Sequence, residues 1–159
     1  MPQAPHFLDN TDLKILRALQ SNGKLSNVAL AELLGMSPSP CLRRVKQLED
    51  SGVIDRYVAL IDRPKAGLDL MAFVEAKVPQ IAGRQIEEDF KQAVMQQPSI
   101  VACYITAGQY DFLLRVVAKG MDDYAKLAQE VLLRLPGVQD LRTSFVLEAF
   151  KDTTEMPLY

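Results

Sequence analysis

Gly35 and the residues that follow it constrain the fold of this chain more than any other part of its sequence. A glycine directly after a leucine-rich stretch suits the left-handed position that closes a helix. Met36, Ser37 and Pro38 then suit the start of the next helix, because Ser37 can accept from exposed amides and proline loses no hydrogen bond at the first helical position. Two helices joined by so short a turn predict a helix-turn-helix.

The N-terminal third as a whole predicts three helices. The first runs from about residue 9 to 20 and can be capped by Asp9 or Thr11, the second begins near Ser26, and the third begins at Pro38 and ends at Ser51-Gly52. Their helical spacing predicts a set of inward-facing residues: Leu13, Leu16, Leu19, Leu30, Leu33, Leu34, Leu42, Val45 and Leu48. A β-like run is expected from Val53 to Ile61, which would make the motif a winged-type helix-turn-helix.

Basic residues concentrate on the third predicted helix. The whole chain carries a net charge of -2, yet the stretch from Ser37 to Gln47 holds basic residues and no acidic one. A local basic surface can coexist with an acidic remainder. In a helix-turn-helix the second helix enters the major groove of double-stranded DNA, where arginine can read guanine with two hydrogen bonds. The predicted DNA-binding residues are Ser37, Pro38, Ser39, Arg43, Arg44, Lys46 and Gln47, with Lys24, Ser26 and Asn27 nearby on the DNA backbone.

An isolated Arg-Arg pair more often marks only a solvated helix face. The capped helix, the glycine turn and the inward leucines together favour DNA binding over that simpler interpretation.

The rest of the chain changes from a helical to an alternating pattern. Residues 62–69 contain a proline and a glycine and are the expected linker. Strands are expected over 70–78, 99–107, 110–118 and 138–150, and helices over 84–96 and 121–135. The order βαββαβ predicts a ferredoxin-like domain. The chain is thus expected to be α+β, with a helix-turn-helix domain at 1–61, a linker at 62–69 and a second domain at 70–159.

A ferredoxin-like sheet carries both helices on one face, so its other face needs cover. Met71 and Phe73 are expected on that second face, which is then too apolar to stand in water. Pairing of two such sheets across a two-fold axis would bury it, and a dimer also suits paired DNA half-sites.

Composition excludes several other classes. No apolar run is long enough to cross a bilayer, and the N-terminus lacks the features of a secretion signal. Cys41 and Cys103 match no metal-ligand spacing, and we interpret both as reduced, inert thiols of a cytoplasmic protein. An enzyme is the main alternative, but the only histidine is His6, in a tail expected to be disordered, and no phosphate loop, dinucleotide motif or metal cluster is present. We expect no catalytic activity, no metal and no cofactor.

With these features in place, the chain resembles the Lrp/AsnC family, also called feast/famine regulators. The resemblance covers nearly the whole length and is carried by LDNTDLKIL at 8–16, LAELLGMSPSPCLRRVKQLEDSGVIDRY at 30–57, Gly67-Leu68 in the linker and TAGQYD at 106–111. It implies a transcription regulator of amino-acid metabolism that forms dimers and commonly octamers. It also implies an amino-acid effector, with leucine or methionine weakly favoured.

The resemblance places the effector near the loop that joins the second and third strands of the C-terminal domain. The matching residues are Thr106, Ala107, Gly108, Gln109, Tyr110 and Asp111, and the stretch 141–144, with Thr143 and Ser144, is a weaker candidate from a neighbouring subunit. Gly108 could let backbone approach a ligand, and Asp111 could balance an ammonium group. Glycine and aspartate are also ordinary residues of a hairpin turn, so a purely structural role stays open. An architectural DNA-organising protein without a physiological ligand is the second alternative, because its sequence could look almost the same.

Overall fold

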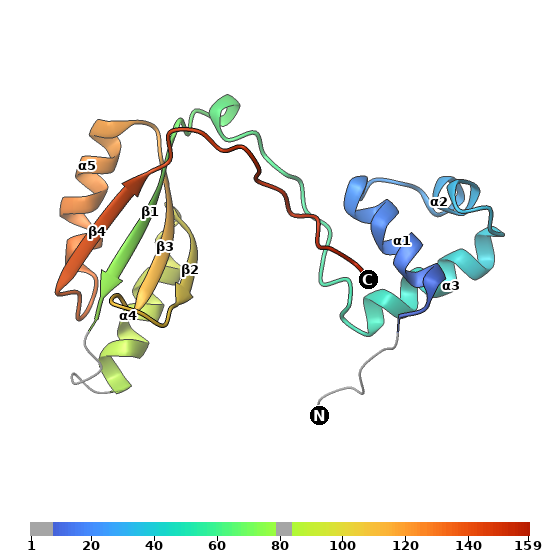
Figure 1. Cartoon of the computed structure of the whole chain (residues 1–159), viewed down its shortest axis with the longest axis horizontal. Helices are drawn as coiled ribbons and strands as arrows, with labels where there is room; N and C mark the ends of the chain where they lie inside the picture. The colour runs from blue at the N-terminus through green and yellow to red at the C-terminus, as the bar shows by residue number, and fades with distance from the viewer. Residues whose placement is uncertain (1–7, 79–83) are drawn as a thin grey trace. The chain divides into compact units, whose positions relative to one another are not determined.

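The computed structural model describes residues 8–78 and 84–159 of the chain, so His6 lies outside the described residues. These residues form two compact units (Figure 1). The helical unit contains the described residues up to Leu60 together with Lys151–Tyr159, and the sheet unit contains the described residues of Ile61–Phe150. Each unit has a hydrophobic core of its own.

The helical unit is built from three helices, as predicted. They are α1 (Asn10–Ser21), α2 (Asn27–Leu33) and α3 (Pro38–Asp50). Helix α1 begins after Asp9, whose carboxylate accepts from the backbone N–H groups of Thr11 and Asp12 at 2.8 and 2.9 Å. Helix α2 begins after Ser26, whose hydroxyl accepts from the N–H of Ala29 at 3.1 Å. These two predicted N-caps, Asp9 and Ser26, are therefore confirmed, and each satisfies amides that a helix start leaves without a partner.

The turn between α2 and α3 is closed by Gly35 with a φ of 64°, the left-handed conformation that favours glycine. Ser37 lies directly before α3 and Pro38 in its first turn, also as predicted. The hydroxyl of Ser37, however, makes no capping hydrogen bond, contrary to our expectation. This hydroxyl is therefore available to another partner.

The core of the helical unit confirms part of the predicted inward set and corrects the rest. Its fully or nearly buried members are Ile15, Leu16, Leu30, Ala31, Cys41 and Leu48. Leu33 and Leu42, expected inside, are 64% and 43% exposed. A helix has 3.6 residues per turn, so Cys41 and Leu48, seven positions apart, share a face, whereas each step of three turns back by about 60°. Residues predicted inward from a strict spacing of three, such as Leu42, therefore rotate away from the buried face of the helix.

Residues 53–61 form no strand, so the expected β-like run is wrong. The N–H of Ile54 instead donates to the carbonyl of Leu48 at 3.0 Å and closes the end of α3. The hydroxyl of Tyr57 donates to Glu49 at 3.0 Å, and burial together with this carboxylate raises the pKa of Tyr57 to about 12. A strand needs a ladder partner for its backbone, and here the segment bonds back to α3.

The last nine residues of the sequence, Lys151–Tyr159, pack within the helical unit rather than with the second domain as expected. The guanidinium of Arg17 donates to the carbonyl of Leu158 at 2.7 Å. The side chain of Gln20 donates to the carbonyl of Met156 at 3.2 Å and accepts from its N–H at 2.6 Å. The Leu158 side chain packs against the core of the helical unit. This segment is therefore a structural part of the three-helix unit.

The sheet unit has the predicted βαββαβ order. Its elements are β1 (Leu70–Lys77), α4 (Arg84–Gln96), β2 (Ile100–Ile105), β3 (Phe112–Ala118), α5 (Met121–Glu130) and β4 (Asp140–Phe145). Two 3-10 turns are also present: η1 (Pro64–Ala66) precedes β1, and η3 (Leu132–Arg134) lies between α5 and β4. The strands are antiparallel in the order β2-β3-β1-β4, which is the ferredoxin-like arrangement. The strands are shorter than predicted, most clearly β4, which ends at Phe145 rather than at Phe150.

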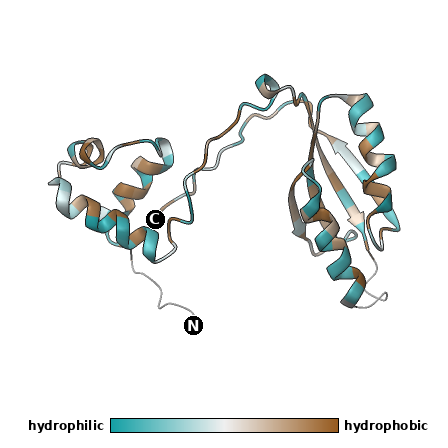
Figure 2. Ribbon diagram, turned by 180° about the vertical axis from the view of Figure 1, so that it is seen from behind, coloured by the Kyte–Doolittle hydropathy of each residue, from teal (hydrophilic) through white to brown (hydrophobic). Residues whose placement is uncertain are grey.

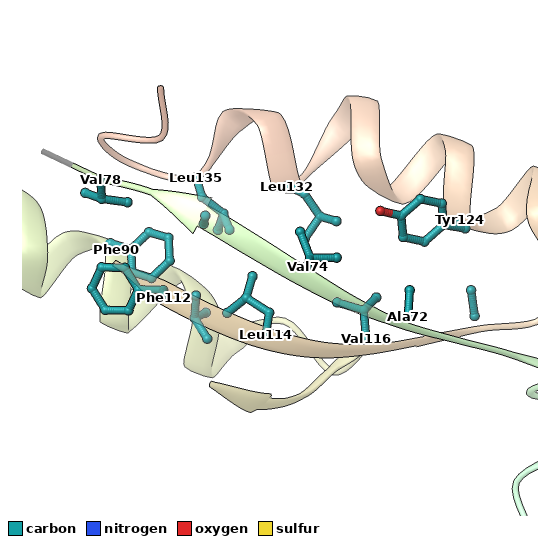
Figure 3. Packing of buried hydrophobic residues seen from close by; sticks show 13 residues of the cluster. Ala72, Val74, Val78, Phe90, Phe112, Leu114, Val116, Tyr124, Leu132 and Leu135 are labelled. Carbon is teal, nitrogen blue, oxygen red and sulfur yellow. The ribbon is translucent and has the colours of Figure 1, made fainter. Parts of the chain in front are cut away.

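One face of the sheet and the two helices enclose the core of this unit (Figure 3). Ala72, Val74 and Ala76 of β1 point into it, and the ring centroids of Phe90 and Phe112 lie 4.4 Å apart, towards the end of the core near Val78 (Figure 3). Both α4 and α5 carry hydrophobic and hydrophilic residues in alternation along their length (Figure 2). This alternation lets one side of each helix cover the sheet and the other meet solvent.

The opposite face of the sheet, here called the open face, carries the alternate residues of each strand. The strand register places on it Met71, Phe73, Glu75, Ala102, Tyr104, Leu113, Arg115, Val117, Arg142 and Ser144. Met71 and Phe73 were predicted there, and Phe73 is 37% exposed. Glu75 and Arg142 approach to 3.7 Å across neighbouring strands. The open face is thus apolar with a few charged groups.

Candidate nucleic-acid and effector sites

Helix α3 presents most of the predicted DNA-binding residues on its outer side. Successive residues of a helix are about 100° apart, and Cys41 and Leu48 fix the inward direction. Ser39, Arg43 and Lys46 then point away from the core. The exposed predicted residues of the motif are Ser37, Pro38, Ser39, Arg43, Lys46 and Gln47. The structure therefore gathers donors suited to base edges and phosphates on one helix face.

Arg44 differs from its neighbour, because its guanidinium is engaged inside the helical unit. It donates to the carboxylates of Asp9 at 2.7 Å and Asp12 at 2.9 Å, and its side chain is 29% exposed. These bonds raise the pKa of Arg44. The N–H of Asp12 and the guanidinium of Arg44 hold the pKa of Asp9 below its usual value. Arg44 thus fixes α3 to the start of α1 and does not lie free on the outer face.

Two of the predicted residues near α2 also have structural partners. The side-chain amide of Asn27 donates to the carbonyl of Pro38 at 2.9 Å and so ties the start of α2 to the start of α3. Ser26 caps α2, while Lys24 is exposed. Sequence reasoning named Asn27 for the DNA backbone and missed this bond, which no local pattern signals.

The predicted effector loop joins β2 to β3 and is held at both ends. The N–H and the hydroxyl of Thr106 donate to the carbonyls of Asp111 and Tyr110 at 2.9 and 3.0 Å. The carboxylate of Asp111 accepts from the N–H of Val78 at 2.9 Å, just after β1. Residues Ala107, Gly108 and Gln109 at the tip are exposed. Hydrogen bonds therefore hold both ends of the loop in place, while the residues at its tip are exposed to solvent.

The hydroxyl of Tyr110 connects this loop to the start of β4 by donating to Asp140 at 2.9 Å, and this bond raises the pKa of Tyr110. Sequence reasoning missed Asp140, since a polar residue at a strand start is unremarkable by itself. Gly108 takes no positive φ, and a Cβ added there would meet nothing within 4 Å. The backbone of this chain therefore does not itself require glycine at that position.

The weaker effector candidates on β4 do not lie together. Thr143 lies on the helix-covered face, where its hydroxyl is 2.6 Å from that of Tyr124. Ser144 pairs with Phe73 and lies on the open face. Neighbouring residues of a strand point to opposite sides, so Thr143 and Ser144 cannot line one pocket in the same way.

Neither metal chemistry nor a membrane span is indicated by the described part of the chain. Over residues 8–78 and 84–159, no group of histidine, cysteine and carboxylate side chains could hold a metal ion. Within the same ranges no helix is long and apolar enough to cross a membrane. Cys41 is buried and Cys103 half-buried, and burial raises the pKa of both thiols, as expected of unreactive cysteines.

Comparison with known proteins agrees with both units. Residues 8–55 match the model of a winged helix-turn-helix DNA-binding domain, and residues 71–156 match that of the Lrp/AsnC ligand binding domain. The leucine-responsive regulatory protein of Haemophilus influenzae is 41% identical over 152 residues, which cover 95% of this chain and 90% of the relative. The leucine-responsive regulatory protein of Escherichia coli K12 is 40% identical over 149 residues, which cover 94% of this chain and 90% of that relative.

Solved structures give the same result. A transcriptional regulator of Neisseria meningitidis, solved in complex with L-methionine, matches with a TM-score of 0.91 and 41% identity over 95% of this chain and 97% of the other. An AsnC family regulator of Agrobacterium tumefaciens matches with a TM-score of 0.89 and 33% identity, and the match covers 94% of this chain and 97% of the other.

A helix-turn-helix with a basic outer face, followed by a separate ligand-binding domain, defines a DNA-binding transcription regulator. The chain belongs to the Lrp/AsnC family of these regulators.

Proposed function

We propose that this chain is a homodimeric regulator of amino-acid metabolism that reads DNA with α3 and senses an amino acid with its sheet unit. The observation that carries the proposal is the outer face of α3, where Ser39, Arg43 and Lys46 lie together on a helix that Arg44 anchors to the start of α1. A helix in the major groove meets base edges with its N-terminal half and phosphates along its sides.

The DNA contacts follow from this orientation. Ser37, Pro38, Ser39, Arg43, Lys46 and Gln47 face the groove, and Lys24 lies near the DNA backbone. Arg44, Ser26 and Asn27 act as positioning residues, because each is bonded inside the helical unit. This assignment narrows the set expected from the sequence, in which Arg44 was a direct contact.

The effector is proposed to be a small amino acid bound at the tip of the loop Thr106–Asp111, with Ser144 as a further candidate. The tip of this loop is exposed, and neither backbone conformation nor neighbouring atoms require a glycine at Gly108. A glycine there instead leaves room for a ligand to approach the backbone closely, which supports the proposed site. A relative from Neisseria and a feast or famine regulatory protein from Mycobacterium tuberculosis were both solved with L-methionine. We therefore favour methionine or leucine for this chain.

The ligand screen tests the effector. Thermal unfolding of the full chain is recorded with each of the twenty amino acids, since a ligand that prefers the folded state raises the melting temperature. We expect leucine or methionine to give a rise that is lost in Asp111→Ala. No response to any amino acid would favour an architectural DNA-organising protein instead.

The open face of the sheet supports the dimer. Met71, Phe73 and Tyr104 give this face an apolar surface that a second copy would bury across a two-fold axis. Phe73→Glu would place a charge in this interface, and equilibrium sedimentation should show dimers or assemblies of dimers for the wild type and a monomer for the variant. A monomeric wild type at micromolar concentration would refute the dimer.

Octamers, built from such dimers, and a cytoplasmic location complete the proposal. We assign no catalytic activity, because the family consists of transcription regulators.

A further inference from the structure

A hollow of about 290 Å³ lies in the helical unit between α1, the turn before α3 and α3 itself. Apolar side chains of the turn and Pro40 line its floor, while Thr11 and Lys14 of α1 and Arg43 of α3 stand around it. Of the residues around it, Arg43 and Arg44 have roles in the proposed function, whereas Thr11 and Lys14 have none so far.

Its charge comes from two cations, Lys14 and Arg43. Arg44 also borders the hollow, but its charge is opposed by Asp9 and Asp12. Neither Lys14 nor Arg43 forms an ion pair with any residue that the structure describes. Two cations and the Thr11 hydroxyl beside one hollow match the needs of a tetrahedral oxyanion, which accepts hydrogen bonds from several sides.

The place of the hollow along α3 identifies the anion. A helix in the major groove has a phosphate strand along each of its flanks. One flank of α3 carries Leu42 and Glu49 and faces the start of α2, which is proposed to meet one strand. The hollow lies on the opposite flank, with Pro40 and Arg44.

We infer that Thr11 and Lys14, with Arg43 beside them, form a seat for a DNA phosphate on the strand away from α2. This inference rests on the proposed function, because it requires α3 in the major groove. It extends the DNA surface onto α1, and it makes Lys14 a contact that positions the protein without reading sequence.

The test is Lys14→Gln in the full chain, with binding to an operator duplex and to an unrelated duplex measured by fluorescence anisotropy over a range of salt concentrations. Affinity for both duplexes should fall by the same factor, roughly tenfold at low salt, and the slope of log K against log salt should shrink by about one for each engaged α3. Lys14→Arg should keep the wild-type slope. Lys126→Gln, the same charge change on exposed α5 of the sheet unit, is the matched control and should leave binding unchanged.

A neutral methylphosphonate placed at single positions of the operator locates the phosphate. At one position per half-site it should weaken the wild type clearly more than Lys14→Gln, because the variant has already lost part of the same contact. The seat is refuted if Lys14→Gln binds like the wild type while Arg43→Ala binds weakly, or if the loss is confined to the operator. Failure of the wild type to bind any duplex would instead refute the proposed function itself.

Discussion

Arg43 and Arg44 are adjacent, of one residue type, and differ in role because a helix turns by about 100° between them. Arg43 points outward from α3, whereas Arg44 meets Asp9 and Asp12 at the start of α1. The sequence predicted both as DNA contacts, since residue type and local charge are the same for both. The difference depends on the packing of α1 against α3, which no local pattern contains.

Alanine substitution should distinguish the structural role of Arg44 from the DNA-binding role of Arg43. Arg44→Ala leaves two carboxylates without their cation, so the melting temperature should fall by several degrees and DNA affinity should fall as a consequence. Arg43→Ala should keep the wild-type melting temperature and lose DNA affinity directly. Calorimetry and anisotropy on the same samples check this, and equal melting temperatures for Arg44→Ala and the wild type would show that the ion pairs do not hold the unit together.

Asp9 gives a prediction on pH. Its pKa is lowered in the folded chain from the ordinary value of 3.8, so the unfolded chain takes up the proton first as pH falls. The carboxylate therefore stabilises the fold above about pH 4, and this contribution is lost as pH drops through the folded-state value. Melting curves from pH 3 to 7 should show the wild type more stable than Asp9→Asn at neutral pH, with the gap closing below pH 4. A gap that stays constant with pH would contradict the assigned contacts.

At the scale of elements, the helix starts and the βαββαβ order along the chain were well predicted from the sequence. Asp9, Ser26 and Gly35 act through their nearest neighbours, so a local pattern suffices to place them. The strand expected at 53–61 failed because a strand depends on a partner elsewhere in the chain. The exposed positions of Leu33 and Leu42 were missed because two small residues, Ala31 and Cys41, fill the core instead.

The two serines before α2 and α3 offer a matched pair of substitutions. Ser26 accepts a capping bond from Ala29, so Ser26→Ala should lower the free energy of unfolding by about 1 kcal/mol. Ser37 makes no such bond, so Ser37→Ala should change stability little and reduce DNA affinity. Urea unfolding and DNA titration of both variants check this. A large stability loss in Ser37→Ala would mean that its hydroxyl does cap α3.

At the scale of the whole molecule, the last nine residues of the sequence, Lys151–Tyr159, belong to the helical unit, which otherwise consists of N-terminal residues. Arg17 and Gln20 of α1 bind their backbone, and Leu158 adds to the core of the helical unit. From the sequence we assigned these nine residues to the second domain because they follow it directly in the chain. Contacts between residues 141 positions apart, such as that of Arg17 with Leu158, leave no sequence signal. The same limit applies to the site, where Tyr110 meets Asp140 and the pairing could not be foreseen.

Removal of Lys151–Tyr159 should therefore destabilise the helical unit selectively. Amide hydrogen exchange should show reduced protection in α1 and unchanged protection in β1 and β3, because the lost bonds end on α1. Arg17→Ala should reproduce part of the effect, and Arg134→Ala, on an exposed turn of the sheet unit, serves as its control. Unchanged exchange in α1 after the removal would show that the segment does not support the helical unit.

The central claim is that the outer face of α3 reads DNA, and its most direct measurement is selection of bound fragments from the source genome by the wild type and by Arg43→Ala. The wild type should enrich a discrete set of sites with a common motif. Arg43→Ala should retain its melting temperature and lose that enrichment. Equal enrichment of the same sites by both proteins, or no enrichment by the wild type, would contradict the account.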